Sequence, residues 1–219
     1  MTPRDIVICE HAPKRADAFR RWLPGARVLK RYEGESVPDS FDAIILSGGP
    51  MSAYAEDRRR FPFLEEEFHL VTEAAKGPSG SAPLVVGICL GAQLMTLALG
   101  GNVIQAELVA GWNAIEPSRP HPLYGWQPAV MQFEWHSNRI VRLPDGAELL
   151  ARSATDSIEA FAWGEKMFAT AYHPEIAMED AVRIFTESGK STAVLSLDSL
   201  GGAVEHPERA SRTFFDFLF

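Results

Sequence analysis

The sequence predicts an α/β fold with a mostly parallel central sheet that is covered by helices on both faces. Short apolar runs rich in Val and Ile recur through the first half of the chain, separated by segments of helical length. Runs of this kind are typical of strands buried on both faces, and their alternation with helices is typical of a parallel sheet. The chain has 219 residues, of which 46% are hydrophobic and 23% charged, as in folded globular proteins. We expect residues 1–219 to form a single domain.

The first half of the chain supplies the parallel strands and the helices between them. The strands are expected at residues 6–9, 28–29, 43–46 and 84–88. Helices are expected at residues 14–22 and 61–76, and in the second of these apolar side chains recur at helical spacing among glutamates. Residues 77–83 are rich in Gly, Ser and Pro, which predicts a flexible loop.

The pattern changes after residue 102, where shorter strand-like runs follow one another closely. This spacing predicts added antiparallel strands, at residues 129–133, 148–151, 158–163 and 167–171. Two helices are expected to close the sequence, at residues 178–188 and 209–219. Residues 117–128 contain four prolines and are expected to form an irregular surface loop, a kind of segment that often carries function.

The charge and the cysteine content indicate which binding partners and which cellular location to expect. The 21 basic and 29 acidic residues give a formal net charge of −8 without a basic stripe, which argues against nucleic-acid binding. Two cysteines are too few for a disulfide-stapled secreted fold, and no secretory signal opens the sequence. Residues 84–99 carry no charge, but they are interrupted by glycines and too short to span a membrane. We expect a cytoplasmic protein that binds neither nucleic acid nor membranes.

Cys89 lies in the most specific motif of the chain, Gly87-Ile88-Cys89-Leu90-Gly91. An apolar strand precedes it and a helical run at residues 92–99 follows, which is the context of a nucleophile elbow. Glycines allow the tight turn, and the N-terminus of a helix stabilises a thiolate. The simpler interpretation is that Cys89 is a small buried hydrophobe, as most free cysteines are. Cys9 has no glycine frame, and we expect it to be a thiol of the core.

A cysteine nucleophile needs a base, and the sequence contains six histidines. His173 stands out because it follows an expected strand and is separated from Glu175 by one residue. Side chains two residues apart project to the same side of an extended backbone, so this carboxylate can fix the imidazole tautomer and leave the other nitrogen facing a thiol. A solvated pair on a surface turn is the simpler alternative. His11 lies at an ordinary element end and is set aside.

The order of these motifs resembles that of a known family. Gly87-Ile88-Cys89-Leu90-Gly91-Ala92-Gln93, followed much later by His173-Pro174-Glu175, is similar to the class I (triad) glutamine amidotransferases, in particular the glutaminase domain of GMP synthase and its standalone relatives. The resemblance runs from about residue 5 to residue 175 and includes Ser47-Gly48-Gly49-Pro50 and Trp135-His136. It implies a flavodoxin-like three-layer sandwich with a few added antiparallel strands.

The resemblance implies a reaction for three of these residues. Cys89 would attack the side-chain amide of glutamine, His173 would transfer protons and Glu175 would orient His173. Ammonia would leave, and water would hydrolyse the γ-glutamyl thioester to glutamate. The expected ligand is glutamine or a γ-glutamyl small molecule, with a separate ammonia-accepting synthase subunit as a further partner, because the sequence ends without room for a synthase domain.

The resemblance also implies residues that hold the substrate. The backbone N–H groups of Gly49 and Leu90 would stabilise the oxyanion, since a glycine lets the backbone approach it closely. The residues implied in substrate binding are Gly48, Gln93, Trp135 and His136. No metal cluster, phosphate-binding loop or dinucleotide motif is visible in the sequence, and we expect neither a metal nor a cofactor.

Two departures from the family pattern leave other functions open. Ser137-Asn138 stands where many relatives have Gly-Asp, and Glu159-Ala160-Phe161 stands where Gln-Ala-Phe is common. They put the details of substrate holding or of a partner surface in doubt rather than the thiol chemistry. A γ-glutamyl peptidase with the same site and a catalytically silent binding protein of the same fold therefore remain alternatives. The elbow alone also fits other cysteine hydrolases, but these do not explain His173 and Glu175.

Overall fold

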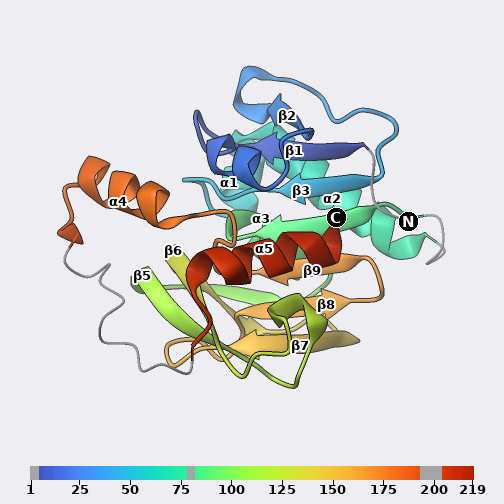
Figure 1. Cartoon of the computed structure of the whole chain (residues 1–219). Helices are drawn as coiled ribbons and strands as arrows, with labels where there is room; N and C mark the ends of the chain where they lie inside the picture. Colours follow the sequence, from blue (N-terminus) through green and yellow to red (C-terminus); the bar gives the residue numbers. More distant parts are fainter. Residues whose placement is uncertain (1–4, 78–81, 193–203) are drawn as a thin grey trace.

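The computed structural model describes residues 5–77, 82–192 and 204–219 and contains a nine-stranded sheet, shown in Figure 1. The strands follow the order β2-β1-β3-β4-β9-β8-β7-β5-β6. The first five strands in this order pair in parallel, and each later pairing is antiparallel. The expected α/β class with added antiparallel strands is therefore confirmed, although the antiparallel part is as large as the parallel part. Most of the loop expected at residues 77–83 lies outside the described residues.

The parallel half of the sheet has the strand order of a flavodoxin-like fold. Its strands are β1 (Ile6–Glu10), β2 (Arg27–Lys30), β3 (Ala43–Leu46), β4 (Leu84–Ile88) and β9 (Met167–Thr170). Because these strands run in one direction, their carboxyl ends meet at one edge of the sheet. In open α/β sheets this edge is where ligands bind.

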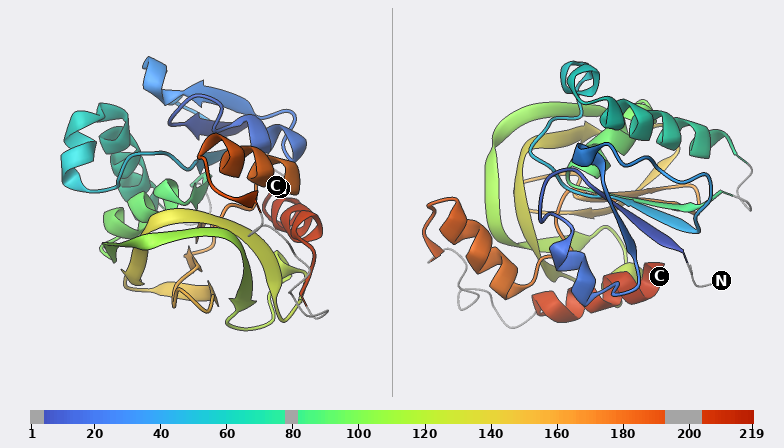
Figure 2. Two further views of the ribbon diagram at one scale, coloured as in Figure 1. Left: turned by 90° about the vertical axis from the view of Figure 1, so that its left-hand side faces the viewer. Right: turned by 90° about the horizontal axis from the view of Figure 1, so that it is seen from above.

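Helices cover both faces of the parallel half, as the right panel of Figure 2 shows with the sheet seen between them. Ile8, Ile45 and Val86 face a core that includes Phe214 and Phe215 of α5 (Pro207–Leu218). Their chain neighbours face the opposite core, beneath α2 (Pro62–Lys76) and α3 (Leu90–Ala98). This alternation explains why the strands read as continuous apolar runs.

The antiparallel half is dominated by a long curved hairpin of β5 (Asn102–Pro117) and β6 (Val130–Arg142). It joins the sheet through β7 (Ala147–Arg152) and β8 (Ala160–Trp163). Both views of Figure 2 show the hairpin bending over the end of the sheet. The sequence predicted only the first part of β6, because buried polar residues interrupt the apolar pattern there. It did not predict β5, in which exposed and half-buried polar residues leave no continuous apolar run.

Two further expectations differ from the structure. Residues 14–22 form only a short 3-10 helix, η1 (Asp17–Arg21), because the segment is too short to sustain an α-helix and is anchored instead by burial of Phe19. Residues 117–128 lie mostly at the surface, as expected, but they are not wholly irregular, since they contain η3 (Pro122–Tyr124), whose Leu123 and Tyr124 are buried against α5. Leu123 and Tyr124 therefore contribute to the core beneath α5.

The remaining helices lie at the periphery. They are η2 (Arg31–Glu33), α1 (Ala55–Arg60) and α4 (Met178–Glu187). Within the part of the chain that the structure describes, no helix combines the length and the apolar character needed to cross a lipid bilayer.

Candidate active site

Cys89 occupies the turn between β4 and α3, at the carboxyl edge of the parallel sheet. Its backbone φ of 52° lies in the region that side chains other than glycine rarely adopt, as at a nucleophile elbow. The turn is held by the Cys89 N–H, which donates to the Thr170 carbonyl of β9 at 2.8 Å. Gly91 is required because a Cβ there would lie 2.0 Å from the Leu46 carbonyl oxygen. The sequence therefore forces Cys89 out of the strand and onto the start of the helix.

His173 follows β9 and is fixed by its backbone and by its ring. Its N–H donates to the Phe133 carbonyl of β6 at 2.7 Å, which ties the turn to the antiparallel hairpin. The ring Nδ1 lies 2.7 Å from the Glu175 carboxylate, and the Trp22 indole N–H donates to the Glu175 carbonyl at 2.9 Å. With Nδ1 engaged by Glu175, the other ring nitrogen is left for the Cys89 thiol, whose sulfur also lies 3.8 Å from the Trp135 carbonyl oxygen.

The protonation of His173 is set by the balance of three effects. Burial lowers the pKa of the imidazole, but the charges of Glu175 and Cys89 and the hydrogen bonds to both outweigh it and raise the pKa from 6.5 to about 10. At neutral pH the imidazole is therefore protonated beside the sulfur. An imidazolium in this position can stabilise a thiolate and later deliver a proton.

Gly48 and Gly49 form a turn that lies directly over Cys89 and His173. A Cβ on Gly48 would lie 2.8 Å from the His173 Cε1, so glycine alone permits the close approach of the backbone. A Cβ on Gly49 would likewise lie 2.9 Å from side-chain atoms of His11 and of Leu90. Leu90 is the first residue of α3, so its backbone N–H has no partner within the helix and is available to an anion.

A cavity of 570 Å³ opens beside Cys89. The predicted site residues on its wall are Gly48, Gly49, Cys89, Trp135, His173 and Glu175. Three basic side chains also line it, namely Lys14, Arg15 and Arg183. A chamber of this size and mixed lining is typical of a small-molecule site.

Gln93 and His136 were expected to contact substrate, but their side chains do not line this cavity. The side-chain oxygen of Gln93 accepts a hydrogen bond of 3.4 Å from the side-chain amide of Asn138, one of the residues that depart from the family pattern. Asn138 in turn accepts a hydrogen bond from the Tyr54 hydroxyl. His136 points away from the cavity, into a buried cluster of carboxylates. The structure thus gives Gln93 a polar partner of its own and turns His136 away from the cavity.

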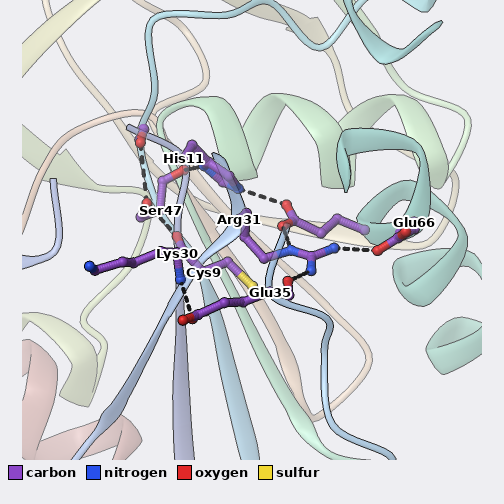
Figure 3. Close-up of polar contacts among 9 residues, drawn as sticks. Cys9, His11, Lys30, Arg31, Glu35, Ser47 and Glu66 are labelled. Atoms are coloured by element: carbon purple, nitrogen blue, oxygen red, sulfur yellow. Dashed lines mark hydrogen bonds and ion pairs between the residues drawn. The ribbon is translucent and has the colours of Figure 1, made fainter. Parts of the chain in front are cut away.

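His11, which was set aside on sequence grounds, lies beside Ser47 (Figure 3) and packs against Gly49 of the Gly48-Gly49 turn. Its Nδ1 lies 3.0 Å from the Ser47 carbonyl and its Nε2 lies 2.8 Å from the Glu67 carboxylate. Both ring nitrogens are therefore engaged. Glu67 also accepts from Arg31 at 3.2 Å. The only sequence signal was the position of His11 at the carboxyl end of a strand, since Glu67 lies 56 residues away.

Glu134, His136 and Glu159 are the described residues whose ligand atoms converge closely enough to hold a metal ion. Burial raises the pKa of Glu134 and, together with the charge of Glu134, raises that of Glu159 to about 10. Burial and the charge of His173 lower the pKa of His136 to about 4, so that this ring is neutral. The charge of His173 thus affects the pKa of His136, although none of the three residues lines the cavity.

The fold and this site are those of an α/β protein with a cysteine at a strand–helix turn, facing a histidine–glutamate pair. A model of the family described as glutamine amidotransferase class-I matches residues 27–187. The chain belongs to the class I glutamine amidotransferase family.

Individual relatives agree with this assignment. The chain is 36% identical to a GMP synthase (glutamine-hydrolysing) of Thermotoga sp. over 135 residues, which cover 62% of this chain and 24% of the relative. It is 30% identical over 172 residues to the putative glutamine amidotransferase-like protein YfeJ of Salmonella typhimurium, covering 74% of this chain and 70% of that one. The chain thus spans about a quarter of the length of the Thermotoga GMP synthases that it matches.

The fold is shared with solved structures. A glutamine amidotransferase from Thermotoga maritima superimposes with a TM-score of 0.75 at 23% sequence identity, over 98% of this chain and 94% of the other. At this identity the likeness concerns the fold.

Proposed function

We propose that the protein is a glutaminase-type thiol hydrolase, which cleaves the side-chain amide of glutamine to glutamate and ammonia. The observation that carries the proposal is the arrangement of Cys89, His173 and Glu175, with the 2.7 Å contact between His173 and Glu175 and the thiol at the wall of the cavity. The raised pKa of His173 supports it, because a protonated imidazole stabilises the thiolate that attacks.

In the first half-reaction the Cys89 sulfur attacks the amide carbon of glutamine. The carbonyl oxygen becomes an oxyanion, which the backbone N–H groups of Leu90 and Gly49 stabilise by on the order of 3 kcal/mol each. The His173 imidazolium gives its proton to the departing nitrogen, so that ammonia leaves and a γ-glutamyl thioester remains on Cys89.

In the second half-reaction water attacks the thioester. His173, now neutral, accepts a proton from the water molecule, and the same backbone donors stabilise the second oxyanion. Collapse of this intermediate releases glutamate and restores the thiolate beside the imidazolium. Glu175 holds the ring in one tautomer throughout, since its carboxylate accepts from Nδ1.

A γ-glutamyl hydrolase is a second candidate, and the cavity favours it. The volume of 570 Å³ is in the range of pockets for drug-sized ligands and is more than a free amino acid fills. Lys14, Arg15 and Arg183 on the wall suit a leaving group that carries its own carboxylate. The chemistry at Cys89 is the same, with a larger amine in place of ammonia.

A synthase-type polypeptide is the partner that we propose as acceptor of the ammonia. The proposal rests on the GMP synthases that the chain matches, because the matched segment is about a quarter of their length. Glutamine hydrolysis that increases when such a polypeptide is added would support this partner, and an unchanged rate with every synthase tested would contradict it.

The test of the main proposal is release of ammonia and glutamate from glutamine by the wild type and by Cys89→Ala. The proposal predicts release by the wild type alone, and equal rates would overturn it. The same two proteins are then given γ-glutamyl dipeptides. Faster release of an amino acid than of ammonia would favour the γ-glutamyl hydrolase, and inactivity towards both substrate classes would favour the silent binding protein.

A further inference from the structure

Three buried side chains from two parts of the antiparallel half point at one another. Glu134 and His136 lie two residues apart on β6, so their side chains project from the same face of the strand. Glu159 precedes β8 and approaches them from the opposite side. Their ligand atoms all lie within 4.8 Å of one another, and the three residues are 0%, 4% and 0% exposed.

The polar atoms that face the centre of this cluster are unsatisfied. One oxygen of Glu134, one oxygen of Glu159 and both ring nitrogens of His136 have no hydrogen-bond partner among the described residues. Buried polar groups without partners are rare and costly, so each needs an explanation. Three such side chains aimed at one point indicate a missing common partner.

The outward-facing oxygens of the two carboxylates are held in place. The Asn113 amide donates to the second oxygen of Glu134 at 2.6 Å, and the Ser153 hydroxyl donates to that of Glu159 at 2.7 Å. The backbone of Glu159 is fixed as well, by hydrogen bonds to Ala151 and Ala171. Carboxylates with one oxygen supported from outside and one bare oxygen turned inward have the arrangement found at metal ligands.

The burial of two carboxylates next to each other also favours a bound cation. A divalent cation between Glu134 and Glu159 would offset the repulsion of two carboxylates that are buried side by side. Arg139 does not supply this charge, because its guanidinium pairs with Asp156 at 3.2 Å. A single proton shared between Glu134 and Glu159 would satisfy the carboxylates but would leave both nitrogens of His136 unpartnered.

We propose that Glu134, His136 and Glu159 bind a divalent transition-metal cation. One imidazole nitrogen and two carboxylate oxygens suit Zn²⁺ or Mn²⁺, with further positions open to water. The residue between the two β6 ligands is Trp135, which lies on the cavity wall, and its carbonyl oxygen is 3.8 Å from the Cys89 sulfur. The ion would fix this strand segment beside the nucleophile and has no part in the bond-breaking steps.

The test uses Cys89→Ala protein, since the Cys89–His173 pair could itself bind Zn²⁺. Metal content is measured by mass spectrometry after dialysis against Zn²⁺ or Mn²⁺ and removal of free metal, and thermal unfolding is followed with and without the ion. The proposal predicts about one ion per chain and a midpoint that rises with the concentration of the ion. This readout does not depend on activity, so its result is independent of the proposed function.

Glu159→Gln in the same background removes one ligand while keeping its shape, and it should abolish both the bound ion and the midpoint shift. Glu148→Gln is the matched control, because Glu148 lies on the neighbouring strand β7 in a half-exposed ion pair with Arg119 and should retain both. Absence of metal in folded Cys89→Ala protein would overturn the proposal, as would equal binding by the Glu159→Gln variant. An infrared band of a protonated carboxylic acid that Glu159→Gln removes would also overturn it, in favour of a shared proton.

Discussion

Two buried cysteines, each with a histidine and a glutamate close by, lie at the same edge of the parallel sheet. Cys9 lies in β1, one residue before its end, and is grouped with His11 and Glu67, whereas Cys89 follows β4 and is grouped with His173 and Glu175. The three residue types are the same, but only the second group reaches a cavity.

The difference lies in access and in which ring nitrogen is free. Cys9 is fully buried, and burial together with the charge of Glu67 raises the pKa of its thiol well above the ordinary value. Both nitrogens of His11 are occupied, by Ser47 and Glu67, so this ring cannot accept a proton from a thiol. In the second group one nitrogen of His173 remains for Cys89. Under the proposed function, the same three residue types form a nucleophilic site only where an elbow and an open cavity give access to the thiol.

The largest expected effect separates the two cysteines. Cys89→Ala should lower glutamine turnover by about 1,000-fold or more, since nothing else at the site can form the thioester. Cys9→Ala should leave turnover unchanged and should lower the free energy of unfolding by about 1–3 kcal/mol through lost packing. Ammonia release and urea unfolding of both variants measure this. Comparable activity losses in two well-folded variants would contradict the assignment of Cys9 to the core.

Substitution of Glu175 should affect turnover, whereas substitution of Glu67 should affect stability. Glu175→Gln keeps the shape of the turn but removes the carboxylate that fixes the His173 tautomer, so turnover should fall by about 100-fold to 10,000-fold with little change in stability. Glu67→Gln leaves Arg31 without a full counter-charge in the interior and should cost about 3–5 kcal/mol of unfolding free energy. Equal activity of wild type and Glu175→Gln would show that Glu175 does not orient the ring.

The pKa of His173, the histidine beside Cys89, should lie far from the ordinary value of an imidazole. The His173 pKa of about 10 lies above 6.5, so its interactions stabilise the fold fully below pH 6.5 and this stabilisation is lost as the pH rises through about 10. Magnetic resonance of the imidazole should show His173 still protonated at pH 8. In Glu175→Gln the pKa should be lower, and the loss of stability from pH 7 to 10 should be smaller. A wild-type midpoint near 6.5 would contradict the account of the ion pair.

The smallest loss of turnover is expected at His11, which acts on the site through the Gly48-Gly49 turn. His11→Asn should loosen that turn and misplace the oxyanion donor, which lowers kcat by roughly 10-fold and leaves KM nearly unchanged, because full loss of such a donor costs roughly 100-fold to 1,000-fold. His69→Asn is the control, because His69 is an exposed residue on α2. A change in KM without a change in kcat would indicate that His11 serves substrate binding instead.

Much of the parallel half could be predicted from the sequence. Its strands are apolar runs that lie between helices, and local composition is sufficient to find such segments. The Gly87 to Gly91 motif likewise carries its geometry in five adjacent residues, since the glycines are demanded by close approach to Leu46 and Met95. His173 and Glu175 are two residues apart, so their contact also follows from local spacing.

The features that sequence reasoning missed depend on contacts between distant positions. His11 meets Glu67 across 56 residues, and Glu134 meets Glu159 only because β6 bends back towards β8. Polar residues that are buried by such contacts also hide the strands that carry them. For this reason β6 was predicted to end near Phe133, directly before Glu134 and His136 begin to face inwards.

The most direct test of the central claim is the reaction of the folded protein with a glutamine analogue that carries an electrophile in place of the amide. Cys89 should gain the mass of one analogue, glutamine should protect it, and Cys9 should remain unmodified. Intact-mass measurement followed by peptide mapping gives all three results. An adduct on Cys9, or no adduct in protein that still hydrolyses glutamine, would contradict the assignment of Cys89 as the nucleophile.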